Sequence, residues 1–435
     1  MKPVVVIGAG LAGCEATWQI VKRGGRVVLY EMKPEHYSPA HHSPNFAELV
    51  CSNSFKSESM ENAPGVLKEE MGQLDSFILK VAKEAKVPAG DSLAVDREAF
   101  SKRITQTLEG LGNVEIIRQE VSSIPENEIT IIATGPLTSD GLNKEIQRLT
   151  GDQHLFFYDA ISPIVTADSI NFKKAFKASR YGKGGNDYVN CPMNEEEYDR
   201  FVNALIQAEK TPLRSFEKKH FFEGCLPIEE LAERGRETLA FGPLKPVGLI
   251  DPMTGKQSYA IVQLRQEDQF ETLFNLVGFQ TRLKHEGQKR VFRMIPGLER
   301  AEFVRLGSVH RNTFIDSPRL LGESLQLRLF PQLFLAGQIT GVEGYMESTA
   351  MGLLAGINTY RCGMGLPSVV PPPTTAMGAL IHYITHSPSI PFQPMNINFG
   401  LFPPLQGKSK GRQKRLLLAR RALKEMGEWK KKYEI

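Results

Sequence analysis

The sequence has few cysteines, and their spacing argues against a disulfide framework and against a structural zinc site. The five, an odd number, lie far apart and form no Cys-x-x-Cys pair: Cys14, Cys51, Cys191, Cys225 and Cys362. Small secreted domains and zinc ribbons depend on paired or closely spaced cysteines. We therefore expect free thiols and a reducing, cytoplasmic location.

Long apolar runs are also absent. No stretch reaches the roughly 18 uncharged apolar residues that a membrane span requires. The first expected strand begins at Val4, without the basic segment that opens a signal peptide. The composition, 41% hydrophobic and 23% charged, is ordinary for a globular protein. Since domains average about 150 residues, a chain of 435 residues is expected to form two or three domains, and we favour two.

A net positive charge is missing from most of the chain and is found in its last segment. Residues 401–435 hold eleven Lys and Arg against three Glu, a net charge of +8, whereas the other 400 residues carry −4. A basic tail on an acidic body is typical of a protein that binds a polyanion such as nucleic acid. The alternative is a solvated helix that packs through apolar residues at helical spacing: Leu416, Ala419, Leu423 and Met426.

The opening segment, VVVIGAGLAGCEATWQIVKRGGRVVLYE, has the pattern of a dinucleotide-binding β-α-β unit. Val4 to Ile7 is a predicted buried strand, and a second strand ends at Glu31, whose carboxylate can accept ribose hydroxyls. The turn between strand and helix has the G-x-G-x-x-G spacing, which lets a pyrophosphate approach the backbone at the helix N-terminus. The predicted contacts are Gly8, Ala9, Gly10, Leu11, Ala12, Gly13 and Glu31.

Two later segments favour FAD over a nicotinamide nucleotide as the bound dinucleotide. ITIIATGPLTSD (129–140) is a strand that runs into a Thr-Gly turn, similar to the second nucleotide-contacting turn of two-dinucleotide-fold flavoproteins. LFLAGQITGVEGYMESTAMGLLAG (333–356) is a strand, a glycine-rich loop and a helix beginning near Glu347, whose positive end would face the flavin or the pyrophosphate. A small-residue helix packed tightly on a sheet is the alternative. The predicted contacts are Thr134, Gly135, Gly337, Gln338, Gly341, Glu343, Gly344, Glu347 and Ser348.

The expected fold class is α/β, with a Rossmann-like FAD-binding domain of the two-dinucleotide-fold flavoprotein type. We expect this domain to be discontinuous, at 1–164 and 306–435. Residues 165–305 differ in composition and pattern, with clustered prolines and glycines, strand-like runs (YAIVQLRQ, NLVGFQT) and a helix candidate capped by Asn194. They predict an inserted α+β domain that supplies substrate contacts. The proline-rich segment GLPSVVPPPTTAMG is expected to lead into a helical, basic C-terminus.

The segments VVVIGAGLAGCEA and LFLAGQITGVEGYMESTAMGLLAG resemble those of the GidA-like flavoproteins that modify uridine in tRNA. The larger GidA enzymes, which act on the wobble uridine, carry an additional C-terminal region for which this chain has no room. The short-form relatives, the TrmFO family of folate- and FAD-dependent tRNA (uracil-5-)-methyltransferases, are more similar. Segments resembling that family follow in order along nearly the whole chain: PAHHSPNFAELVCSNS, VPAGDSLAVDREAF, FFEGCLPIEELAERG, AFGPLKPVGLIDP, QLRQED, MIPGLE and HRNTFIDSPRLL.

The resemblance implies that a one-carbon unit passes from 5,10-methylenetetrahydrofolate to C5 of the T-loop uridine of tRNA, giving ribothymidine. It implies that reduced FAD supplies the electrons and that NAD(P)H reduces the flavin again. Uracil C5 is a poor nucleophile until a group adds at C6, so such chemistry requires a thiolate beside the base. An exposed base must also leave its loop to reach a buried ring.

Two cysteines match the functional cysteines of that family. Cys225 precedes a helix start marked by Pro227, where a helix N-terminus would lower the thiol pKa, and we assign it as the nucleophile toward C6. Cys51 is expected to face the flavin as a general base or auxiliary thiol. The two assignments could be reversed, and a buried inert cysteine is the alternative for each. Cys14, inside the first nucleotide helix, is expected to serve packing.

Other side chains have supporting roles in this prediction. The Tyr345 ring could stack on the flavin or pterin, although a core tyrosine is the alternative. Folate or phosphate could be bound by a polar cluster formed by His310, Arg311 and Asn312. The glutamate tail of folate or RNA phosphate could be bound by Lys245 and Arg265. Adjacent residues of a loop make a poor metal pair, so no metal is assigned to His41 and His42.

Three further functions remain open from the sequence. The chain could be an NAD(P)H-dependent flavin oxidoreductase of a small substrate, which leaves the two cysteines and the basic tail unexplained. It could be a flavin-bearing RNA-binding protein that assists tRNA folding, or it could modify the wobble uridine as GidA does. The sequence does not decide between NADH and NADPH, nor does it give the oligomeric state.

Overall fold

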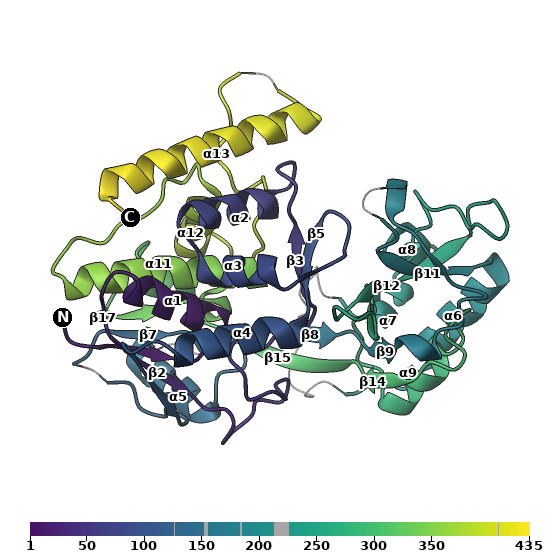
Figure 1. The fold of residues 1–435 in the computed structure, drawn as a ribbon, viewed down its shortest axis with the longest axis horizontal. Helices are drawn as coiled ribbons and strands as arrows, with labels where there is room; N and C mark the ends of the chain where they lie inside the picture. The colour runs from purple at the N-terminus through teal and green to yellow at the C-terminus, as the bar shows by residue number, and fades with distance from the viewer. Residues whose placement is uncertain (126, 152–154, 183–184, 213–225, 408) are drawn as a thin grey trace.

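A six-stranded sheet lies in the left-hand part of the molecule as drawn in Figure 1. The computed structural model describes residues 1–435 except 126, 152–154, 183–184, 213–225 and 408. The strand order is β16-β17-β7-β1-β2-β6; β16 is antiparallel to β17 and the other pairs are parallel. The strands are β1 (Val4–Ile7), β2 (Val27–Glu31), β6 (Val114–Arg118), β7 (Thr130–Ile132), β16 (Gln326–Leu327) and β17 (Phe330–Leu335).

Both faces of this sheet are covered, which explains why its strands are continuous apolar runs. Side chains alternate between the faces of a strand, so Val4 and Val6 enter one hydrophobic core while Val5 and Ile7 enter another. The first core is built with α1 (Leu11–Val21), α4 (Arg97–Glu109) and α11 (Tyr345–Gly363), and the second with α5 (Asp140–Thr150). This arrangement is the predicted Rossmann-like α/β fold.

A layer of helices packs on α1, α4 and α11 over the first of these faces (Figure 1). It contains α2 (Ala63–Gln73), α3 (Phe77–Glu84), α12 (Ala376–His386) and α13 (Gly411–Tyr433), with a small sheet of β3 (Ser54–Ser57), β4 (Lys86–Val87) and β5 (Ser92–Val95) beside it. The basic C-terminus is therefore helical, as predicted. The predicted apolar stripe is only half right, because Ala419 and Met426 are buried but Leu416 and Leu423 are only partly so. The buried stripe is Leu418, Ala419, Ala422, Met426 and Trp429.

The middle of the chain forms a second, entirely antiparallel sheet of order β10-β11-β12-β13-β9-β14. Asn194 caps α6 as predicted, and its capping box with Glu197 is complete. The predicted strand at 259–266 corresponds to β12, whereas the one at 275–281 begins earlier and ends at Leu276. The strands are β9 (Ile164–Thr166), β10 (Phe176–Lys177), β11 (Tyr188–Met193), β12 (Ala260–Gln266), β13 (Leu273–Leu276) and β14 (Phe303–Arg305). The helices are α6 (Glu195–Gln207), α7 (Ile228–Glu233), α8 (Thr238–Phe241) and α9 (His285–Phe292).

Two long strands, β8 (Leu155–Ile161) and β15 (Ser308–Phe314), pair antiparallel between the two large sheets (Figure 1). Among the described residues, the remaining short elements are α10 (Ser317–Leu320) and the 3-10 turns η1 (Ala167–Ser169), η2 (Arg180–Gly182) and η4 (Gln338–Thr340). We propose the division into 1–164 with 306–435 and 165–305 because the chain enters and leaves the second sheet beside this pair. None of the helices in the described part of the chain is both long and apolar enough to span a bilayer.

Candidate functional site

The glycine turn after β1 is built so that only glycine fits at two positions while the third is left open. Gly8 has φ +99°, and a Cβ there would lie 2.8 Å from the Ala133 carbonyl oxygen. A Cβ on Gly13 would lie 1.8 Å from the carbonyl oxygen of Gly8, so the helix could not pack against the strand. Gly10, at the N-cap of α1, is exposed, and a Cβ on it would have no neighbour closer than 3.9 Å. The open position lets a ligand approach the backbone.

A cavity of about 650 Å³, counting the part open to solvent, lies along this turn. Of the predicted contacts it is lined by Gly8, Ala9, Gly10, Glu31 and Thr134. The Glu31 carboxylate accepts hydrogen bonds from the backbone N–H of Ala9 at 2.9 Å and of Lys33 at 3.0 Å. Glu31 therefore fixes the shape of the turn in addition to facing the cavity.

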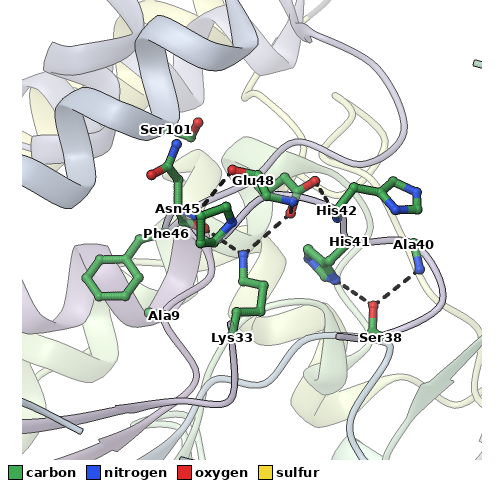
Figure 2. Close-up of polar contacts among 12 residues, drawn as sticks. Ala9, Lys33, Ser38, Ala40, His41, His42, Asn45, Phe46, Glu48 and Ser101 are labelled. Atoms are coloured by element: carbon green, nitrogen blue, oxygen red, sulfur yellow. Dashed lines mark hydrogen bonds and ion pairs between the residues drawn. The ribbon is translucent and has the colours of Figure 1, made fainter. Parts of the chain in front are cut away.

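Part of the segment 33–48 lines this cavity, a role that was not predicted from the sequence: Lys33, His41, Ala47 and Glu48. Lys33 Nζ donates to the Asn45 carbonyl oxygen at 2.6 Å and lies 3.5 Å from the Glu48 carboxylate. Glu48 in turn accepts from the backbone N–H of His42. Figure 2 shows the His41 ring beside Ser38 and the His42 ring turned away, and burial, with the nearby Lys33 charge next, lowers the pKa of His41 to about 4. A neutral imidazole and a buried ammonium thus face the cavity.

The glycines of α11 let this helix lie directly on α1. A Cβ on Gly352 would lie 2.2 Å from the Ala12 carbonyl oxygen, and one on Gly356 would lie 2.6 Å from that of Ala16. Gly352 lies near Ala12, and Gly356 lies near Ala16. Because a step of four residues forward along α11 matches a step of four residues forward along α1, the two helices run in the same direction. Neither N-terminus has a side-chain cap, because Gly10 and Gly344 occupy the N-cap positions. Two sets of free backbone N–H groups therefore point toward the same edge of the sheet, as an anionic ligand requires.

Two buried carboxylates lie at the N-terminus of α11. The Glu343 side chain accepts a hydrogen bond from Gln338, and burial, with the charges of Asp159 and Glu347 adding to it, raises its pKa to about 8. Glu347 pairs with Lys56 at 2.8 Å and accepts the Ile397 N–H through the same oxygen. Its other oxygen, Oε2, has no partner among the described residues. A buried polar atom without a partner is rare, and a ligand that donates a hydrogen bond to it would satisfy it.

Tyr345, the first residue of α11, holds the segment that carries Cys51. Its hydroxyl oxygen accepts hydrogen bonds from the backbone N–H of Cys51 at 2.9 Å and of Ser52 at 3.2 Å. Its ring packs beside Phe55, with centroids 5.6 Å apart. The predicted catalytic residues Cys51 and Tyr345, nearly 300 residues apart in the chain, therefore lie together, and Tyr345 positions the thiol segment.

Two arginines hold the same segment from the other side. Arg97 donates to the carbonyl oxygens of Leu49 and Cys51, and Arg305 donates to those of Val50 and Cys51. Burial, followed by the charge of Asp159, raises the pKa of the Cys51 thiol to about 12, while Arg97 and Arg305 act in the opposite direction. The thiol is therefore protonated in this state of the protein, and two guanidinium groups nearby favour loss of the proton.

The second sheet contributes directly to this network. Glu267 pairs with Arg97, and Arg265 donates to Asn53 Oδ1 at 2.8 Å and to Ser52 Oγ at 3.0 Å. The Asn53 amide also donates to the Gln266 carbonyl oxygen at 2.9 Å. Arg265 was predicted as a ligand for phosphate or the folate tail; in the structure its side chain is buried and engaged with the thiol segment.

The predicted cluster of His310, Arg311 and Asn312 is divided by the strand on which it lies. Because side chains alternate along β15, His310 and Asn312 share one face and Arg311 lies on the other. His310 is opposite Asp159 of β8, and Asn312 approaches the Asp159 carboxylate at 3.5 Å. Burial, then the charges of His42 and Arg305, lowers the pKa of His310. The Arg311 guanidinium lies over the Phe156 ring at 4.1 Å. His310 and Asn312 therefore face the thiol region and Arg311 does not.

The remaining predicted residues are less connected to this site. Cys225 lies outside the described residues. The helix after it, α7, begins with Pro227 at its N-cap as predicted, but it has six residues and two glutamates in its first turn, which weaken its positive end. Lys245 is exposed in the turn after α8. Cys14 is fully buried and donates from Sγ to the Ala9 carbonyl oxygen at 3.2 Å, so its packing role is confirmed.

Residues of this site that were not predicted from the sequence include Lys33, Arg97, Arg305 and Asp159. They are separated from the glycine motifs in sequence and reach the site only through tertiary contacts. Only Lys33, two residues after the acidic end of β2, had a local signal.

The fold and the two glycine-lined helix termini define a Rossmann-like dinucleotide-binding protein. Comparison with known proteins shows the family within this class. The family model described as glucose inhibited division protein A matches residues 3–365. The structures of Aquifex aeolicus GidA in two crystal forms are similar, with TM-scores of 0.70 and 0.69 at 16% and 17% identity; they cover 99% of this chain, and 75% and 78% of those chains.

Relatives with much higher identity are named methylenetetrahydrofolate–tRNA-(uracil-5-)-methyltransferase TrmFO. The protein from Geobacter sulfurreducens is 60% identical over 427 residues, and that from Geotalea uraniireducens is 58% identical; each alignment covers 98% of this chain and 98% of the relative. The protein from Pelotomaculum thermopropionicum is 57% identical over 430 residues, 99% of this chain and 98% of its own. The chain belongs to the TrmFO family of GidA-like proteins.

Proposed function

We propose that this chain is a methylenetetrahydrofolate-dependent tRNA (uracil-5-)-methyltransferase that converts the T-loop uridine to ribothymidine. The relatives described above are named as methylenetetrahydrofolate–tRNA-(uracil-5-)-methyltransferases. The single observation that carries the proposal is the contact of Tyr345 with Cys51. It brings a thiol to the N-terminus of the helix that completes the dinucleotide site, where a redox cofactor and a pyrimidine would have to meet.

The residues present fit FAD. The uncapped first turns of α1 and α11 suit the pyrophosphate, and Glu31 beside the cavity suits the ribose. The unpartnered Oε2 of Glu347 suits a hydrogen-bond donor on the ring system. When bound, FAD supplies the electrons that reduce the transferred one-carbon unit to a methyl group.

The thiols have separate roles in this proposal. Cys225 adds to uracil C6, which makes C5 nucleophilic. Cys51 would remove the proton at C5 as its thiolate, a form that Arg97 and Arg305 favour and that burial and the charge of Asp159 oppose. The reverse assignment of the two cysteines is tested by the variants described below.

The other ligands are assigned by chemistry and position. His310 and Asn312, on the face of β15 toward Asp159, would bind the folate, and Lys245 would bind its glutamate tail or RNA phosphate. The exposed Lys and Arg of α13 would contact tRNA phosphates. NAD(P)H would reduce the flavin. Free thiols and a tRNA substrate favour a cytoplasmic location.

The test is a methylation assay in which each component is omitted in turn. T-loop RNA should gain one methyl group per target uridine only when methylenetetrahydrofolate and NADH or NADPH are both present. The RNA product is analysed by mass spectrometry after digestion to nucleosides. Methylation that depends on S-adenosylmethionine, or a wobble-uridine product, would contradict the proposal, as would oxidation of a small substrate without RNA modification.

Cysteine variants separate the enzyme from a binding protein. Cys225→Ala and Cys51→Ala should each abolish methylation while the protein keeps its flavin and its RNA affinity, whereas Cys362→Ala, on α11, should leave methylation unchanged. Covalent capture of 5-fluorouracil-containing T-loop RNA distinguishes the two roles, because only the nucleophile variant should fail to form the adduct. Full methylation by both variants would indicate a protein that binds tRNA without this chemistry.

A further inference from the structure

Three side chains with metal-binding atoms meet on the surface at the C-terminal end of α12. His382 and His386 lie one turn apart, with their rings stacked at a centroid distance of 4.7 Å and an interplanar angle of 20°. Glu323, from the segment between α10 and β16, places Oε1 3.7 Å from His386 Nδ1. One ligand atom from each of the three lies within 4.8 Å of the others. The expectation of no metal rested on the adjacent pair His41 and His42 and overlooked this His-x-x-x-His spacing.

The residue types and spacing suit a divalent ion of borderline softness. Residues at i and i+4 of a helix lie on the same face, so both imidazoles can turn toward one ion. Two imidazoles and a carboxylate are a common zinc ligand set, with bonds of about 2.0–2.2 Å. A tetrahedron of that size has ligand atoms about 3.3 Å apart, so these atoms must approach by roughly 1.5 Å. All three side chains are exposed, which leaves their rotamers free to do so.

A hydrogen bond to Thr385 prepares one imidazole for this role. The Thr385 hydroxyl donates its only proton to the Ile381 carbonyl oxygen at 2.7 Å, and its oxygen lies 2.9 Å from His386 Nδ1. The oxygen must therefore accept from Nδ1–H, which leaves the lone pair on Nε2. Glu323, whose Oε1 lies 3.7 Å from Nδ1, must then turn toward Nε2 to share the ion. Metal-binding histidines usually donate their second N–H in this way.

We propose that Glu323, His382 and His386 bind one transition-metal ion, represented by Zn²⁺, with water as a fourth ligand. Imidazole ligands favour zinc, copper and nickel, whereas Mg²⁺ prefers oxygen ligands, so the site discriminates between these classes. The ion would join α12 to the segment leading into β16. The chain after α12 returns to the dinucleotide site, where the Met395 carbonyl oxygen accepts from the Glu343 N–H at 2.9 Å. The ion would therefore anchor the start of a segment that supports that site.

The test is calorimetric titration of flavin-loaded protein, without a histidine tag and stripped of metal, with ZnCl₂ and separately with MgCl₂. One Zn²⁺ per chain and no Mg²⁺ should bind. His382→Ala and His386→Ala should each weaken zinc binding by about a hundredfold, and Thr385→Val by about tenfold. His285→Ala, at the exposed start of α9, is the matched control and should leave zinc binding unchanged.

A second measurement needs no substitution. Zn²⁺ should protect His382 and His386 of the wild-type protein from diethyl pyrocarbonate, detected by peptide mass spectrometry, and should leave modification of His285 unchanged. Absence of saturable zinc binding, zinc binding by either α12 histidine variant that is as tight as that of the wild type, or equal modification with and without zinc would each overturn the proposal. Neither measurement uses methyl transfer, so the result is independent of the proposed enzymatic function.

Discussion

Replacing Tyr345 by Phe should loosen the segment that carries Cys51 while leaving the rest of the fold in place. The substitution removes only the hydroxyl, whose oxygen accepts the N–H groups of Cys51 at 2.9 Å and Ser52 at 3.2 Å. The ring, its packing beside Phe55 and the arginine contacts to the Cys51 carbonyl remain. The thiol segment is therefore detached from α11 and stays attached to Arg97 and Arg305.

The expected magnitude follows from the two hydrogen bonds. A buried N–H left without an acceptor costs about 1–3 kcal/mol. Both residues are half-buried, so water can replace part of the missing interaction, and we expect about 2 kcal/mol for the pair. This corresponds to roughly a thirtyfold increase in the population of the opened segment.

The assay is the rate of Cys51 alkylation by iodoacetamide, followed by peptide mass spectrometry at one pH. The rate should rise by about thirtyfold in Tyr345→Phe, while the buried thiols Cys14 and Cys191 stay unmodified. Tyr383→Phe is the matched control, because its hydroxyl donates one exposed hydrogen bond to the Gln393 carbonyl oxygen. An unchanged Cys51 rate would refute the positioning role of Tyr345, and equal increases at all three thiols would indicate global unfolding instead.

Three further predictions concern the helix packing, a buried carboxyl and the basic helix. Gly352→Ala places a Cβ 2.2 Å from a carbonyl oxygen of α1. Thermal unfolding should therefore show a destabilisation of about 3 kcal/mol, and the amount of bound flavin should decrease. Gly112→Ala is the control, because its Cβ would have no atom within 4 Å, and it should change neither measurement. The pKa of Glu343 is raised from 4.5 to about 8, so between these pH values the native state keeps a proton that the unfolded state has released, and wild-type stability falls as pH rises. In denaturant titrations, Glu343→Gln should remove up to about 1.4 kcal/mol per pH unit from this dependence of stability on pH. Parallel curves of stability against pH for the two proteins would contradict this prediction. Replacing Arg420 and Lys424 of α13 by Ala should reduce the slope of log affinity for tRNA against log salt by about 1 for each phosphate that the variant no longer neutralises, measured by filter binding; an unchanged slope would mean that α13 does not bind the RNA.

The fold could be predicted from the sequence wherever a local pattern dictates geometry. In the turn from Gly8 to Gly13, close packing admits only glycine at Gly8 and Gly13, so these two positions of the motif correspond to the structure residue by residue. The second flavoprotein-type segment, from Gly337 through α11, is another case, because glycines at 352 and 356 allow α11 to lie on α1. The helix that begins after Asn194 is a third case, because the hydrogen bond of its cap is local and could be predicted from the sequence.

The environment of Cys51 could not be predicted, because it depends on residues far away in the sequence. Arg97, Arg305 and Tyr345 reach this segment from three different parts of the chain. Nor could the sequence show that β15 separates His310 from Arg311, since this requires knowledge of which residues form a strand. Arg265 was considered as a ligand for an anion because of its charge alone, and only the tertiary structure shows that its guanidinium is buried against Asn53 and Ser52.

The central claim is that this chain transfers a carbon atom from folate to uracil C5 at a site shared by a flavin and a thiol. The most direct measurement uses methylenetetrahydrofolate labelled with ¹³C at the methylene carbon, T-loop RNA and NADPH or NADH, with mass spectrometry of the released nucleosides. We predict ribothymidine that carries the label in its methyl group with wild-type protein, and no labelled product with Cys225→Ala. Unlabelled ribothymidine, or label at any other nucleoside, would contradict the claim.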